Sequence, residues 1–306
     1  MTRAAPQTAH RSEQTALSSL LELRPGAERP VASGAEAVAQ GLAVAKVYAF
    51  ASVDYPGAAI SQVYDSDGTT AVGAFDFDPG GIAQTTAFTF SGGAYQILAV
   101  PNSTASVATG INAAGLLIGA YVDLAGDTHG FAISGGSFSD VDFPGASRSL
   151  AIGVNDVGQI VGSFTDAAGV AHGFVTDGSG AFRIIDFPGA TSTEAAGINT
   201  AGDVVGVWSD ATGSHGFLLQ GNVFSSIAFP LATSTTAFGV NDAGNIAGSY
   251  TDAAGNQHGF VLAGGAFTSV DVAGAAGSQL TRIKNDGLVT GVYTDAVTGV
   301  HGLIGR

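Results

Sequence analysis

The apolar positions of this chain fall in short segments rather than in long amphipathic runs. Segments rich in Val, Ile, Phe, Tyr and Thr alternate with clusters of Gly, Asn and Asp, for example over 236–241, 245–251, 257–263 and 266–272. This pattern is typical of strands joined by tight turns. Beyond residue 46 no segment sustains a 3.6-residue apolar period, so helical repeats are disfavoured. The pattern predicts an all-β protein.

The four-segment unit recurs at a fixed period. Its clearest marker is His-Gly-Phe or His-Gly-Leu, with the histidines 43 residues apart at His129, His172, His215, His258 and His301. One period earlier, Thr86-Ala-Phe occupies the same slot. Four strands in roughly 40–45 residues match the size of a propeller blade. We therefore expect a six-bladed β-propeller of four-stranded blades.

A second marker, Asn-x-x-Gly, supports this count. It occurs at Asn112, Asn155, Asn199, Asn241 and, one residue shorter, at Asn285, while Asp65 fills the sixth slot. Asn favours Asx turns and Gly accepts positive φ, so each occurrence predicts a tight turn. A third marker, Asp-Phe-Pro-Gly-Ala, occurs at Asp142 and Asp186 and has a variant at Asp54.

The order of the segments predicts how the ring closes. The last repeat stops after its third segment, at 301–306, whereas 48–56 is a fourth segment with no repeat of its own. Pairing these two segments would remove an exposed sheet edge. We expect a domain over 47–306 that is closed by an N-terminal strand, and an N-terminal extension over 1–46 that is flexible or partly helical.

Charge and composition exclude several partners. Residues 47–306 carry 20 Asp and one Glu against five Lys and Arg. Such an acidic surface repels phosphate backbones, so nucleic acid is not an expected partner. No apolar run reaches the roughly 18–20 residues that span a membrane. The chain has no cysteine, which excludes disulfides and thiolate metal sites. The oligomeric state is left open.

The three markers together resemble the HAF-repeat family of bacterial proteins over 47–306. The matching features are the His-Gly-Phe triplets, turns such as 153–162, and the Asp-Phe-Pro-Gly-Ala segments. The resemblance implies an exported repeat protein, extracellular or periplasmic, and does not imply one activity. No clear signal peptide precedes the repeats, so a cytoplasmic location is the alternative.

The repeated polar residues are expected to be structural. Each histidine follows an aspartate by five or six residues, as in Asp252 and His258, which predicts a hairpin contact in each repeat. The histidines lie on the third strand from the axis, too far apart to share one metal ion. We therefore predict no metal or cofactor. Calcium on the axis is an alternative, held by oxygens of the Asn slots and Asp65.

Function is sought where the repeats disagree. Glu194 is the only Glu of the ring, and its slot elsewhere holds Val107, Leu150, Thr236 or Leu280. Arg282 and Lys284 interrupt an apolar strand, and Phe238 is assigned to the Arg282 slot. The candidate catalytic residues are Glu194 and Arg282. The candidate ligand-binding residues are Phe238, Arg148, Trp208 and Lys284.

Three functions remain open. The first is binding of a small molecule or glycan at the central pocket. The second is an enzyme (lyase, isomerase, cyclase or hydrolase) with Glu194 as acid or base and Arg282 as an anion binder. The third is a structural or protein-interaction ring. We expect Glu194, Phe238 and Arg282 to line one arc of the pocket.

Overall fold

The computed structural model describes residues 48–77, 85–177, 179–295 and 299–306. Every regular element within these ranges is a β-strand, which confirms the all-β prediction. The described residues contain no helix long and apolar enough to cross a membrane. The predicted extension over 1–46 lies outside the described residues.

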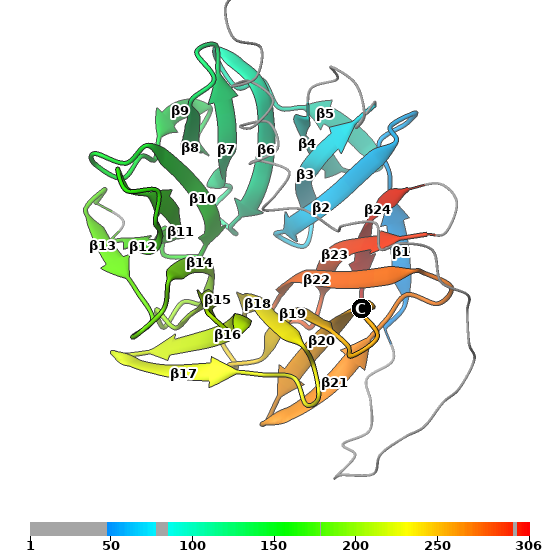
Figure 1. The fold of residues 1–306 in the computed structure, drawn as a ribbon. Coiled ribbons are helices and arrows are strands. Elements are labelled where there is room, and N and C mark those ends of the chain that lie inside the picture. Colours follow the sequence, from blue (N-terminus) through cyan, green and yellow to red (C-terminus); the bar gives the residue numbers. More distant parts are fainter. Residues whose placement is uncertain (1–47, 78–84, 178, 296–298) are drawn as a thin grey trace, which may run out of the picture.

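The strands form antiparallel sheets arranged around a central axis (Figure 1). The innermost strands are β2 (Ile60–Ser66), β6 (Ser103–Ile111), β10 (Arg148–Val154), β14 (Ser192–Ile198), β18 (Ser234–Val240) and β22 (Gly277–Ile283). The second strands are β3 (Thr70–Asp76), β7 (Leu117–Asp123), β11 (Ile160–Thr165), β15 (Val204–Asp210), β19 (Ile246–Thr251) and β23 (Val289–Thr294).

The two remaining strands of each repeat lie farther out. The third strands are β4 (Thr86–Ser91), β8 (Thr128–Ser134), β12 (Ala171–Thr176), β16 (Gly213–Gln220), β20 (Gln257–Ala263) and β24 (Val300–Gly305). The outer strands are β5 (Ala94–Ile97), β9 (Ser137–Asp140), β13 (Phe182–Ile185), β17 (Val223–Ile227), β21 (Ala266–Val270) and β1 (Phe50–Val53).

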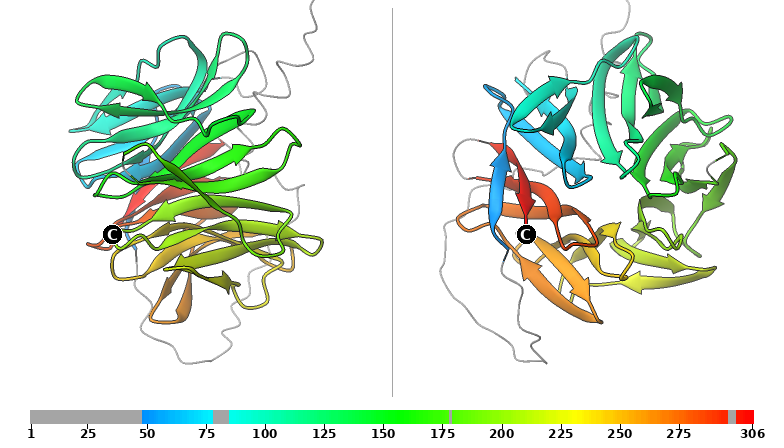
Figure 2. Two further views of the ribbon diagram at one scale, coloured as in Figure 1. Left: turned by 90° about the vertical axis from the view of Figure 1, so that its left-hand side faces the viewer. Right: turned by 180° about the vertical axis from the view of Figure 1, so that it is seen from behind.

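Four of the sheets are separate and have four strands, whereas the strands at the two ends of the described chain share one eight-stranded sheet. The halves of this sheet meet at a single parallel pair, Ile60 with Val300. β1 pairs antiparallel with β24, from Phe50 opposite Gly305 to Val53 opposite Gly302. Figures 1 and 2 show β1 (blue) beside β24 (red). An N-terminal strand therefore completes the last repeat, as predicted.

Each inner strand carries a β-bulge, and in β10, β14 and β18 the glycine just after the bulge lies close to the backbone of the next inner strand. In β14 the register shifts between Ala195 and Gly197, which leaves Ala196 as the bulge. A Cβ on Gly197 would lie 2.6 Å from the Phe238 carbonyl oxygen. Glycine is required here because no side chain fits between the two backbones.

The His-Gly-Phe triplet serves the core. The Phe side chains of the triplets are fully buried between neighbouring sheets, at Phe88, Phe131, Phe174, Phe217 and Phe260. The Phe of Asp-Phe-Pro-Gly reaches the next repeat and stacks on an aromatic residue of its second strand, as Phe143 does on Phe164 at 3.7 Å. That residue in turn stacks on the histidine, His172. The first and third markers of the sequence therefore belong to one stack between repeats.

Candidate functional site

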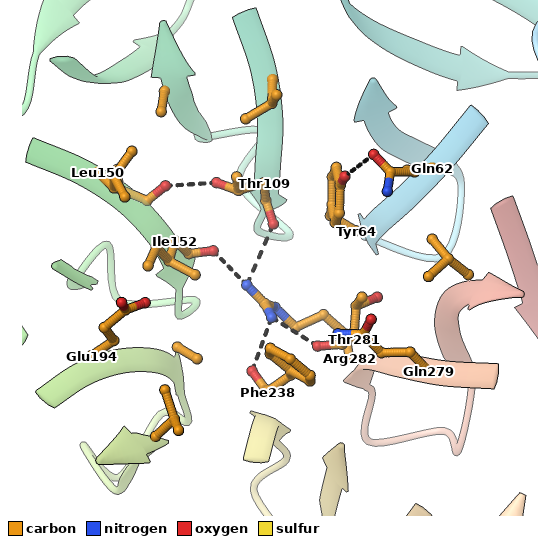
Figure 3. Close-up of a pocket in the computed structure, with 16 residues that line it drawn as sticks. Gln62, Tyr64, Thr109, Leu150, Ile152, Glu194, Phe238, Gln279, Thr281 and Arg282 are labelled. Atoms are coloured by element: carbon orange, nitrogen blue, oxygen red, sulfur yellow. Dashed lines mark hydrogen bonds between the residues drawn. The ribbon is translucent and has the colours of Figure 1, made fainter. Parts of the chain in front are cut away.

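The bulges of the inner strands surround a cavity of about 70 Å³ on the axis (Figure 3). The six bulge residues line it: Tyr64, Thr109, Ile152, Ala196, Phe238 and Thr281. Residues two positions earlier point to the same side, and five of these also line the cavity: Gln62, Val107, Leu150, Glu194 and Gln279. The cavity is thus built from corresponding positions of successive repeats, and the side chains at these positions vary from repeat to repeat.

Glu194 supplies the carboxylate of this cavity. It lies on β14 opposite Val207, and both residues line the wall. Among the described residues none donates a hydrogen bond to the carboxylate or forms an ion pair with it. Burial raises the pKa of Glu194, and the positive charge of Arg148 opposes that shift. The result is a carboxyl group with a raised pKa in apolar surroundings.

Arg282 forms the floor of the cavity and is almost completely buried. Its Nη1 donates to the carbonyl oxygens of Phe238 (2.9 Å) and Thr281 (2.7 Å). Its Nη2 donates to the carbonyl oxygens of Thr109 (3.4 Å) and Ile152. Burial lowers the pKa of Arg282 and nearby Asp65 opposes this. Because the four Nη–H donors serve backbone carbonyls, Arg282 acts as a cross-link between strands.

A second cavity of about 60 Å³ lies on the other side of Arg282, which lines both cavities. Its wall includes Asp65 and Lys284, whose Oδ1 and Nζ atoms are 2.7 Å apart. Asp65 Oδ2 also accepts the Ile111 N–H at 3.1 Å. Lys284, a predicted ligand-binding residue, therefore lies away from Glu194 and is bound to Asp65.

The Asn slots form a chain of hydrogen bonds from repeat to repeat. Asn112 Nδ2 donates to the Asn155 carbonyl at 2.9 Å, and Asn155 Nδ2 does the same to Asn199. Asn241 Nδ2 donates to the carbonyl of Lys284 at 3.2 Å. The Asn155 Oδ1 atom accepts the N–H of Gln159 within its own turn. These contacts are structural, and calcium on the axis stays a prediction.

The contacts correct three slot assignments. Lys284, not Asn285, begins the sixth Asn-x-x-Gly turn, because Lys284 N–H bonds to the Leu288 carbonyl as Asn241 N–H bonds to that of Asn245. Arg282 then occupies the glycine slot, and Thr281 is the counterpart of Phe238.

Two further assignments change. Gln279, rather than Leu280, corresponds to Glu194. Asp65 lies in the glycine slot, immediately after the bulge at Tyr64. The sixth repeat was assigned wrongly by one residue because its turn was aligned on Asn, and Lys284 replaces that Asn. Asp65 was assigned wrongly by two residues because the first turn is shorter, with the N–H of Asp67 bonded to the Thr70 carbonyl.

The structure places the other predicted site residues in different surroundings, one in the cavity and two outside it. Phe238 lines the cavity together with Glu194 and Arg282. Arg148, the first residue of β10, is outside the cavity lining and acts on Glu194 through its charge. Trp208 stacks between Phe187 and His215, with ring centroids 4.2 and 4.5 Å away. Trp208 thus belongs to the stack between repeats.

The histidines make the predicted hairpin contacts and a second contact that was missed. His258 Nε2 lies 3.4 Å from Asp252, and its Nδ1 lies 3.1 Å from Asp271. The second aspartate is the first residue of the Asp-Phe-Pro-Gly marker or its variants, and it recurs at Asp142, Asp186 and Asp54. The repeat of His215 has Ala228 in this slot.

Comparison of the sequence with protein-family models and with curated proteins finds no match. Solved structures are similar in fold. TolB from Acinetobacter baumannii matches 78% of this chain with a TM-score of 0.56 and 12% identity. The chain spans 64% of the length of that TolB.

Two further matches are AofleA and SapL1. The match to AofleA from Arthrobotrys oligospora spans 85% of this chain and 86% of AofleA, with a TM-score of 0.55 and 12% identity. The match to the SapL1 lectin, solved in complex with alpha methyl fucoside, spans 79% of this chain and 91% of SapL1, with a TM-score of 0.52 and 10% identity. At these identities the likeness concerns the fold alone. The chain has a β-propeller fold.

Proposed function

We propose that this chain is a six-bladed propeller that binds a small molecule in the central cavity, with Glu194 as the principal polar contact. The blade count is supported by the eight-stranded sheet, whose two halves have four strands each and meet at one residue pair. The observation that carries the binding proposal is the environment of the Glu194 carboxylate. Its carboxylate faces an apolar cavity and has no hydrogen-bond partner among the described residues. The Glu194 side chain is partly exposed to the cavity, so its carboxylate is free to contact a ligand there, and a few polar groups in an otherwise apolar pocket are typical of ligand sites.

The cavity favours a small apolar ligand over a glycan. Val107, Leu150, Ile152 and Val207 form its walls, whereas a sugar needs a partner for each of several hydroxyls. SapL1 was solved with alpha methyl fucoside, so glycan binding between blades is the competing proposal. Glycan binding between blades is less well supported, because no Trp or Arg recurs from repeat to repeat in this sequence. We therefore place the ligand on the axis.

An enzyme is the second candidate, and the raised pKa of Glu194 favours it. General acids and bases work best when their pKa lies near the working pH. Glu194 would exchange the proton. Arg282 would hold the floor of the cavity and would not bind an anion through its Nη–H groups, since backbone carbonyls already accept them.

The test is a fragment screen by ligand-observed NMR on the whole protein and on Glu194→Leu. Thr236→Val is the matched control, because Thr236 occupies the Glu194 slot in the next repeat but does not line the cavity. We expect fragments that bind the parent and Thr236→Val but not Glu194→Leu. A set of binders that all retain affinity for Glu194→Leu would reject the central site.

The resemblance to HAF repeats supports an extracellular or periplasmic location for this binding protein. Detection of the native protein in the exported fraction of its host cells would test this part of the proposal. Recovery only from the cytoplasm would reject it.

A further inference from the structure

The guanidinium of Arg282 is held across the axis of the ring. Its four carbonyl partners belong to β6, β10, β18 and the bulge of β22, on different sides of the axis (Figure 3). All N–H bonds of a guanidinium lie in one plane. Contacts to carbonyls on several sides therefore fix that plane across the axis.

This orientation turns the flat faces of the guanidinium toward the cavities. Arg282 lines the central cavity and also the second one. Since its Nη–H edges are occupied by carbonyls, the surface left for a ligand is the flat face. Guanidinium faces stack on aromatic rings through cation–π and dispersion contacts. The floor of the central cavity is thus suited to a planar ring.

The walls add hydrogen-bonding groups around such a ring. Glu194 lies on one side, and Gln279 lies on the opposite side (Figure 3). Neither side chain has a hydrogen-bond partner among the described residues. Gln62 is also on the wall, and its Oε1 accepts the Tyr64 hydroxyl. A carboxylate accepts hydrogen bonds when ionised, so the ligand needs a hydrogen-bond donor, such as an N–H group, facing Glu194.

We propose that the central cavity binds a single planar aromatic ring that carries an N–H donor, of the aminated heteroaromatic class. The ring stacks on Arg282, donates to Glu194 and contacts the Gln279 amide at its opposite edge. This inference rests on the proposed function and names the ligand class of the same site. The cavity is open on one side, so any larger group of the ligand extends through the opening.

The test compares three probes of similar size by titration calorimetry on the full chain. 2-Aminopyrimidine is planar and has the donor, pyrimidine is planar without it, and cyclohexanol is a neutral molecule with a donor on a ring that is not flat. We expect 2-aminopyrimidine to bind at least about tenfold more tightly than either of the others, the ratio for one hydrogen bond or one stacking contact. Glu194→Leu should lose this preference over pyrimidine, and Thr236→Val should keep it.

A crystal soaked with 2-aminopyrimidine supplies a second measurement that needs no variant. The ring should lie parallel to the Arg282 guanidinium, with its amine toward Glu194. Equal or tighter binding of cyclohexanol, or a ring outside the central cavity, would overturn the inference. Glu194-dependent binding of fragments that are not planar, without binding of 2-aminopyrimidine, would overturn it and leave the proposed function standing. Absence of any Glu194-dependent fragment would reject both.

Discussion

Lys284 Nζ lies 2.7 Å from Asp65 Oδ1, and this ion pair joins the last inner strand to the first. Elsewhere an Asn side chain links each turn to the next one, as Asn241 does to Lys284. Lys284 replaces the Asn and reaches Asp65, which in turn accepts the N–H of Ile111. The turns are thereby linked in a closed ring of contacts. The contact between the first and last repeats, which we call the seam, is the ion pair of Lys284 with Asp65.

We predict that this seam contributes strongly to stability. Asp65 is only 1% exposed, so removing Lys284 leaves a buried negative charge without its closest positive partner. Lys284→Met should lower the free energy of unfolding by about 1.5–3 kcal/mol in urea titrations. The double variant with Asp65→Asn should lose less than the sum of the two single changes.

The control for the seam is the exposed ion pair of Arg306 with Asp286, at 2.6 Å. Arg306→Met should cost less than about 1 kcal/mol because solvent screens that pair. Equal losses for Arg306→Met and Lys284→Met would contradict a special role for the seam.

The close approach of inner strands predicts intolerance to one methyl group. Gly197→Ala places a Cβ 2.6 Å from the Phe238 carbonyl oxygen and should cost about 1–3 kcal/mol, measured by urea unfolding. Gly277→Ala is the control, since its nearest neighbour would be 3.6 Å away. A Gly197→Ala protein as stable as the control would show that the strands can separate without cost.

Closure by β1 is tested with two truncations. Removal of residues 1–53 takes away β1 and exposes the edge of β24. That protein should aggregate or melt well below the parent, because unpaired sheet edges template association. Removal of residues 1–46 keeps β1 and should leave the melting temperature of the propeller unchanged. Equal behaviour of the two truncated proteins would argue against closure by this strand.

The His258 site predicts a specific pH dependence. The hydrogen bond and the charge of Asp271 raise the pKa of His258, and Asp252 adds to the shift against the effect of burial. A raised pKa in the folded state stabilises the fold below the ordinary histidine pKa of about 6.5. This contribution is lost as the pH rises through the higher folded-state value. Urea titrations at pH 6 and pH 8.5 measure the loss.

The variant for this pH test is Asp271→Asn. It should reduce the stability difference between the two pH values, because the protonated imidazole loses its closest carboxylate. Asp127→Asn removes an exposed carboxylate that forms no side-chain contact with a histidine and should preserve the difference. An unchanged pH dependence in Asp271→Asn would mean that the contact with Asp271 does not raise the pKa of His258 in the folded protein.

Much of this architecture could be predicted because each repeat carries its own turn and core markers. The His-Gly-Phe spacing identified the third strands, and the orphan segment near Phe50 identified the closing strand. The presence of Glu194 and Phe238 in one cavity followed from their departure from the repeat. These are local properties of the sequence, and period-based comparison detects them.

The role of Arg282 could not be predicted from the same comparison. Its slot was assigned wrongly by one residue because Lys284 stands in the Asn slot and the repeat was aligned on Asn285 instead. The partners of its guanidinium are backbone carbonyls, which leave no mark in a sequence. Gln279 was missed for the same one-residue reason.

The central claim is that Glu194 is an ionisable, ligand-facing group in an apolar cavity, and it can be measured directly. Protein labelled with ¹³C at the glutamate carboxyl carbons should show the Glu194 signal as the one that disappears in Glu194→Gln. A pH titration should place its pKa above the ordinary value for glutamate, since burial raises it. Addition of 2-aminopyrimidine should shift this signal and no other glutamate signal. A Glu194 signal that titrates at about 4.3, as in model peptides, and that no cavity fragment moves would contradict the account.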